Sequence, residues 1–117
     1  MALVLGLERI PVTVGAGTSL SAAVPTGTKT VCGMAIPAIW SAAALTFQVS
    51  VDGGSTWLDL YDVTGSEVSV TAAAGQYHAI DPVVFAAINH VKVRSGTSGA
   101  PVVQTADRTI TLVVRGV

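Results

Sequence analysis

The side chains of this sequence that could take part in acid–base or nucleophilic chemistry are few and scattered. The two histidines are His78 and His90, and the single cysteine, Cys32, is distant from both in the sequence. A nucleophile needs a base within hydrogen-bond reach, and a zinc site needs several ligands at short spacings, and the sequence shows neither pattern. A Gly-x-Ser-x-Gly elbow, a phosphate-binding loop and a calcium-loop spacing are also missing. The sequence therefore predicts that the protein is not an enzyme and that it uses no metal or other cofactor.

Aromatic and acidic side chains do gather in one segment. Trp57, Asp59 and Tyr61 alternate with leucines, so the three side chains share one face if the segment is a strand. An aromatic face beside a few polar groups is suited to binding a sugar ring, and these three residues form a candidate glycan-binding ledge. The neighbouring Asp52 and Asp62 lie in turn sequences, where a carboxylate accepts hydrogen bonds from the backbone.

The elements that would position this ledge are two strands joined by a tight turn. Residues 47–51 (FQVSV) alternate apolar and polar side chains with the period of a half-buried strand. Asp52, Gly53 and Gly54 then supply residues that tolerate a positive φ, and residues 57–61 (WLDLY) resume the extended pattern. The sequence therefore predicts a β-hairpin.

Short strands separated by turn signals continue through the rest of the chain. In the last of them, Ile110, Leu112 and Val114 share one face, while a valine on the opposite face indicates a central strand or one covered by a partner. Asp81 followed by Pro82 predicts a single helical turn. This pattern indicates an all-β fold, an antiparallel β-sandwich of about eight short strands. We expect strands in residues 10–14, 18–24, 29–36, 45–51, 56–61, 67–71, 76–80, 89–95 and 107–115.

The composition describes a weakly charged single domain. Of the 117 residues, 50% are apolar and 11% are charged, compared with roughly 25% charged in a typical soluble domain. We therefore expect part of the surface to be buried against copies of the chain or a larger assembly. The formal net charge of −1 gives no reason to expect nucleic-acid binding, and the alternating Lys92 and Arg94 are interpreted as a solvated strand face.

The first residues form an apolar arm. Residues 1–7 read MALVLGL, which lacks both a basic region and the ~20 apolar residues of a membrane span. We expect no membrane association, synthesis in the cytoplasm, and an arm in residues 1–8 followed by a β-sandwich domain in residues 9–117. Exposed apolar surface is unfavourable in water, so the arm should lie on its own domain, on a neighbouring subunit or on another surface. The candidate interface residues are Leu3, Val4, Leu5 and Leu7 in the arm, together with Trp40, which could instead belong to the core.

Several sequence blocks carry a family resemblance. They are IWSAAA, LTFQVS and DGGSTW in residues 39–57, followed by KVRSGT in residues 92–97, PVVQ in residues 101–104 and ADRTITLVVR in residues 106–115. Together they resemble small β-sandwich structural proteins of tailed bacteriophages, and the likeness covers roughly residues 35–115. The motifs are moderately specific and identify a type of phage structural protein.

The resemblance implies a virion component, above all a capsid decoration or cement protein. Such a protein would be made in the cytoplasm of the host bacterium, bind the major capsid protein on the outer shell as a homotrimer, and stabilise contacts between capsomers. The alternative is a tail- or fibre-associated module that binds host surface glycans through Trp57, Asp59 and Tyr61, because a β-sandwich by itself does not fix function.

Overall fold

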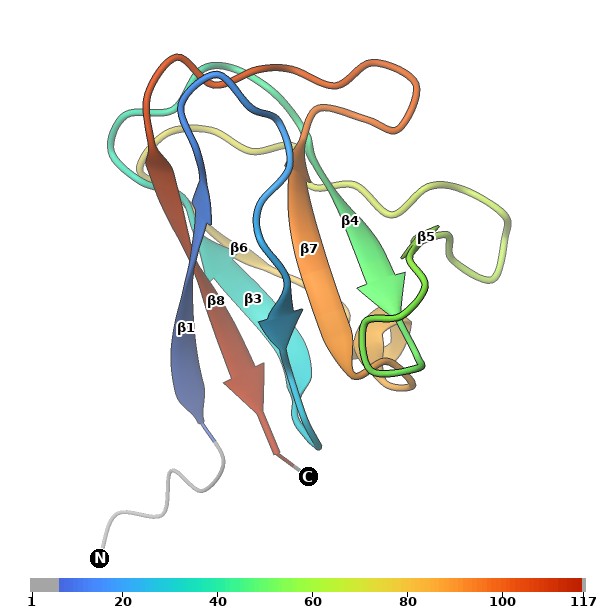
Figure 1. The fold of residues 1–117 in the computed structure, drawn as a ribbon. Helices are drawn as coiled ribbons and strands as arrows, with labels where there is room; N and C mark the ends of the chain where they lie inside the picture. Colours follow the sequence, from blue (N-terminus) through green and yellow to red (C-terminus); the bar gives the residue numbers. More distant parts are fainter. Residues whose placement is uncertain (1–6, 117) are drawn as a thin grey trace, which may run out of the picture.

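A computed structural model describes residues 7–116 and shows two four-stranded antiparallel sheets packed face to face (Figure 1). The predicted β-sandwich is confirmed. Within the described residues there are eight strands and one 3₁₀ turn. They are β1 (Glu8–Val14), β2 (Val24–Pro25), β3 (Thr30–Ala35), β4 (Leu45–Ser50), β5 (Leu58–Asp59), β6 (Tyr77–Ala79), η1 (Pro82–Phe85), β7 (His90–Ser95) and β8 (Arg108–Arg115).

The order of the strands explains several sequence features. The first sheet has the order β1-β8-β3-β6 and the second β2-β7-β4-β5. β8 therefore lies between two neighbours, and of the two explanations for the valine on its outer face the central position is the one observed. β1 is an edge strand, where Pro11 can be accommodated without breaking a ladder on both sides. β1 begins at Glu8, which pairs with Val114, so the sheet starts one residue inside the range assigned to the arm.

Alternate side chains of the facing strands fill the space between the sheets. Phe47 on β4 meets Phe85 of η1 edge to face, with ring centroids 5.1 Å apart. The predicted helical turn is confirmed as η1, whose N-cap Asp81 accepts a hydrogen bond from the Val83 amide at 3.1 Å. The buried aliphatic residues of the central strands are Val31, Met34, Leu45, Val49, Val91, Val93, Ile110, Leu112 and Val114.

Three predicted strands are much shorter than expected or missing. The strand predicted in residues 56–61 is reduced to β5, which pairs with β4 as the second strand of the predicted hairpin. In residues 18–24 only β2 is a strand, because the Ser21 hydroxyl accepts the bond from the Val93 amide (2.9 Å) that a ladder carbonyl would take. Residues 67–71 form only isolated bridges, at Glu67 and at Val70. The Val68 amide donates to the Leu60 carbonyl and the Val70 amide to the Leu45 carbonyl, so the segment changes partner within three residues and forms no continuous ladder.

The loops at one end of the sandwich are joined by a buried glutamine. Gln104 has no exposed surface, and its side-chain amide donates to the Ser41 carbonyl (3.2 Å) and the Ser95 hydroxyl (2.8 Å). Its amide oxygen accepts from the Ser41 amide at 3.0 Å. These bonds fix the loop after β7 against the loop between β3 and β4. No helix in residues 7–116 has the length and hydropathy to cross a bilayer.

Candidate functional site

The predicted glycan-binding ledge lies on the outer side of the second sheet, at β5. Trp57 is partly exposed and Tyr61 is 51% exposed. The Trp57 ring is already engaged, because the Lys92 ammonium lies 4.4 Å from its centroid in a cation–π contact. His90 meets the same ring edge-on, and the indole N–H donates to the Gly54 carbonyl at 3.1 Å. A sugar stacking on the Lys92 side of the indole would have to displace the lysine.

The carboxylate of the ledge belongs to a buried ion-pair cluster. Arg94 is only 5% exposed; its Nη2 pairs with Asp59, and its Nη1 lies 3.3 Å from Glu67 and 3.4 Å from the Thr46 hydroxyl. We call Arg94, Asp59 and Glu67 the Arg94 cluster. Glu67 also accepts from the Ser98 amide at 3.2 Å, so the cluster joins β7 and β5 to two loops.

The interpretation of Arg94 as part of a solvated strand face is therefore wrong. It alternates with Lys92 on β7 as predicted, but Asp59 and Glu67 lie against its guanidinium. A buried cation is expensive unless its donors are satisfied, and two carboxylates and a hydroxyl satisfy this one. Asp59 is thus paired with Arg94 inside the protein. Its carboxylate has fewer oxygen lone pairs left to accept hydrogen bonds from a sugar than the sequence suggested.

The outer face of the first sheet, unlike that of the second, carries mostly uncharged side chains. Across its middle, Thr111 on β8 is flanked by Pro11 on β1 and Ala35 on β3, and Ala35 by Tyr77 on β6. At one end of this surface, Thr13 and Thr109 share a hydroxyl hydrogen bond of 3.0 Å. We call it the neutral face, made of Pro11, Thr13, Ala35, Tyr77, Thr109, Thr111 and Val113; Arg9 and Arg115 lie at its other end.

Gly33 leaves room for the Tyr77 ring on the neutral face. A Cβ placed on Gly33 would lie 2.0 Å from the Tyr77 Oη and 2.5 Å from its Cζ. The phenol ring therefore lies across Gly33 on the sheet surface, and it remains 57% exposed. Gly33 and the Tyr77 ring thus give the β6 side of the neutral face an uncharged patch on which the phenol hydroxyl is the polar group.

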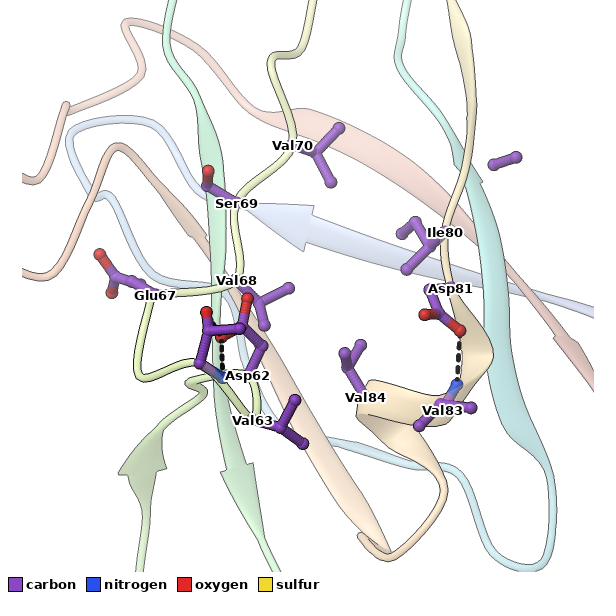
Figure 2. A pocket seen from close by; sticks show the side chains of 12 residues that line it. Asp62, Val63, Glu67, Val68, Ser69, Val70, Ile80, Asp81, Val83 and Val84 are labelled. Atoms are coloured by element: carbon purple, nitrogen blue, oxygen red, sulfur yellow. Dashed lines mark hydrogen bonds between the residues drawn. The ribbon is translucent and has the colours of Figure 1, made fainter.

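A groove opens at the edge of the sandwich where β5 and β6 end the two sheets. Its volume is about 490 Å³, and it lies between the loop after β5 and the β6–η1 segment. In Figure 2, Val68 and Val70 on the loop point toward Ile80 and Val84 on the opposite wall. Val63, fully exposed, and Val83, 71% exposed, stand on its rim. We call it the edge groove; its lining also includes the polar residues Asp62, Thr64, Glu67, Ser69 and Asp81. It was not foreseen from the sequence, because its walls come from segments that are separate in the chain.

The rim turn is preformed by Asp62. Its carboxylate accepts from the Thr64 hydroxyl (2.6 Å), the Thr64 amide (2.9 Å) and the Ser66 amide (3.1 Å), and Gly65 adopts a φ of 84°. The Thr64 hydroxyl bond and these amides lower the pKa of the Asp62 carboxyl. Asp52 plays the same part in the turn between β4 and β5, where the Thr56 hydroxyl is the main cause of its lowered pKa. The predicted turn roles of both aspartates are confirmed.

The candidate interface residues fall into three groups. Leu3, Val4 and Leu5 lie outside the described residues. Leu7 is 43% exposed just before β1. Trp40 is only 8% exposed, belongs to the core and donates its indole N–H to the Ala43 carbonyl at 3.2 Å. Trp40 therefore has little exposed surface for a partner. The sequence left open whether it belongs to an interface or to the core, and the structure places it in the core.

In residues 7–116 no group of three His, Cys, Asp or Glu side chains is placed to hold a metal ion. Cys32 is half-buried, and its Sγ lies 3.5 Å from the Thr30 carbonyl oxygen.

No protein-family model matches this chain, and neither a curated protein nor a solved structure matches it significantly. Function is therefore inferred from the surfaces described above and from the sequence resemblance.

Proposed function

We propose that this protein is a structural component of a tailed-phage virion, a decoration or cement protein that binds the outside of the capsid shell. The observation that carries the proposal is the neutral face. It is a solvent-facing sheet surface whose middle row carries proline, threonine, alanine and tyrosine side chains and no charge, with a pair of threonines beside that row. Charged residues are depleted at the cores of protein interfaces, and tyrosine is enriched there.

The physical advantage of such a face is that little must be desolvated on docking. Burying an unpaired charge costs much more than burying a methyl or a hydroxyl that finds a partner. The threonine hydroxyls can exchange water for backbone groups of a shell protein, while Arg9 and Arg115 at one end can set the orientation. A stable contact buries about 800 Å² on each partner, and the breadth of a four-stranded sheet suits a contact of that kind.

The resemblance to phage structural proteins adds the partners. It implies that the major capsid protein is the receptor and that the attached form is a homotrimer. The low charge of the whole chain suits a protein that stays bound within an assembly. The Arg94 cluster then has a fold-stabilising role on the side that faces away from the shell.

The direct test is binding to capsid shells of the encoding phage that lack this protein, measured by co-sedimentation. Thr109→Glu places a charge on the neutral face at an exposed position, and Thr71→Glu is the matched control in an exposed loop. We expect the wild type and T71E to saturate the shells and T109E to lower the affinity at least tenfold. Normal binding by T109E would remove the neutral face from the proposal, and absence of wild-type binding would reject the capsid role.

The alternative, a glycan-binding module of the tail or fibre, is favoured by the partial exposure of Trp57 and Tyr61 beside Asp59. Immunogold electron microscopy of intact virions separates the two functions. Gold spread over the head supports decoration. Gold at the tail tip supports the glycan module, which then requires that Tyr61→Ala abolish binding on a glycan array.

A further inference from the structure

The edge groove is an apolar surface that the described chain leaves open. Its facing walls carry Val68, Val70, Ile80 and Val84, and its rim exposes Val63 completely. Asp62, Glu67 and Asp81 also line it, so the apolar part of the groove is bordered by carboxylates. The rim turn is rigidly hydrogen-bonded through Asp62, so the groove exists before anything binds in it. A preformed apolar groove with exposed valines on its rim is expected to have an occupant.

The β6 side of the groove offers unpaired backbone as well as apolar side chains. β6 is the last strand of the first sheet and pairs only with β3. The Ile36 amide donates to the Gln76 carbonyl, and the Ile80 amide donates to the Cys32 carbonyl. The backbone groups of every second residue along this segment, those of residues 76, 78 and 80, therefore face β3. The backbone groups of Tyr77 and Ala79 therefore point away from β3, toward the free edge. An added strand could pair with them and insert every second side chain into the groove.

The first residues of the chain have the sequence that such a strand needs. Residues 2–7 read ALVLGL and carry no charge. Leucines occupy positions 3, 5 and 7, and the smaller Ala2, Val4 and Gly6 occupy the positions between. In an extended strand this period places the leucines on one side. Leu7, the first described residue, is 43% exposed, and Leu3 and Leu5 lie outside the described residues.

The topology indicates that the arm comes from another copy. β1, which follows the arm, and β6, which borders the groove, are opposite edges of the first sheet, three strand spacings apart. That separation is ~14 Å at the usual interstrand distance, and six extended residues reach ~20 Å at most. An arm crossing its own sheet would have few residues left to pair with β6.

We infer that residues 2–7 of one copy add as a strand to β6 of a second copy and insert Leu3 and Leu5 into its edge groove. The arm is thus the ligand and the groove the receptor of a self-association. This contact is independent of the capsid role, because it needs no shell and uses the free edge of β6 and the edge groove. Of the neutral-face residues only Tyr77 takes part, through its backbone.

Sedimentation velocity of the full chain over a wide concentration range tests this contact. The arm variant is Leu3→Ser with Leu5→Ser, and its control is Ala2→Ser with Gly6→Ser. The rim variant is Val63→Glu with Val83→Glu, and its control is Val103→Glu, at a position that is 54% exposed on another loop. We expect the wild type and both controls to form oligomers, and the arm and rim variants to be monomers.

Mixing the two monomeric variants gives the sharper result. The rim variant keeps an intact arm and the arm variant an intact groove, so a 1:1 complex is expected to form only in the mixture. A wild type that is monomeric at every concentration, a rim variant that still associates, or a mixture that stays monomeric would each overturn the inference. If the rim variant fails to melt cooperatively, the arm variant, which alters none of the residues in the sandwich, still decides the matter.

Discussion

The two outer faces of the sandwich handle charge in opposite ways. On the second sheet, Arg94 is buried between Asp59 and Glu67, and Lys92 covers Trp57. On the first sheet, the neutral face has no charged residue in its central rows. The chain has only 6 basic and 7 acidic residues, and it uses three of them to fasten loops to one sheet. Charge here stabilises the fold on one side and leaves the other side free for contact.

The largest effect is expected from breaking the charged face. Arg94→Met would leave Asp59 and Glu67 close together without a cation, and breaking a buried pair costs about 3–5 kcal/mol. Because the Asp59 side chain is 34% exposed, we expect a loss of about 3 kcal/mol in the free energy of unfolding, near the lower end of that range. Urea denaturation monitored by circular dichroism measures it.

A triple variant separates charge from packing at the Arg94 cluster. Adding Asp59→Asn and Glu67→Gln to Arg94→Met removes the uncompensated carboxylates, so at least half of the lost stability should return. If the triple variant is no more stable than R94M, the cluster matters through packing and hydrogen bonds rather than charge.

On the neutral face the expected weak point is Gly33. Gly33→Ala would place a Cβ 2.0 Å from the Tyr77 Oη and 3.1 Å from the His78 carbonyl oxygen, so the ring must leave the sheet. We expect a cost of roughly 1–2 kcal/mol, which is typical of overpacking. A double-mutant cycle with Tyr77→Ala measures the coupling, which should exceed about 0.5 kcal/mol. Additive effects would show that the ring does not depend on the glycine.

A smaller effect is expected at Lys92. Lys92→Met keeps the aliphatic stem but removes the ammonium above the Trp57 ring, a contact worth about 0.5–1 kcal/mol at a partly exposed site. Thermal unfolding and Trp fluorescence report the loss of stability and the change around the indole. An unchanged emission spectrum would contradict the stacking.

The smallest effect at ordinary pH is the acid response of the turn that ends β4. The Thr56 hydroxyl and neighbouring groups lower the pKa of Asp52 below its ordinary value of 3.8. A depressed folded-state pKa means that the stabilisation is complete above the unfolded value and is lost as the pH falls through the folded value. The contribution of Asp52 to the free energy of unfolding should therefore be constant above about pH 5 and decline as the pH falls below 3.8. Asp52→Asn should show a shallower decline in urea titrations at pH 2–4.

The sequence predicted the sandwich because its signals are local. Alternation identified the inward side of β4, β7 and β8, and the turn roles of Asp52 and Asp62 followed from their neighbours in the sequence. The prediction failed for residues 67–71, where Val68 bonds to Leu60 and Val70 to Leu45, so that no single strand is the partner of a continuous ladder. It also failed for Arg94, since alternation shows which side of the sheet a residue faces but not what lies over it.

The sequence by itself thus determined most of the strands, the turns at Asp52 and Asp62 and the low charge of the chain, because these depend on composition or on residues a few positions apart. Only the tertiary structure decided that Arg94 meets Asp59, 35 residues away, that Tyr77 lies on Gly33, and that two separate segments enclose the edge groove. The physical reason is that a period of two fixes the side of a strand, whereas the neighbour across the sheet is chosen by the packing of the whole core.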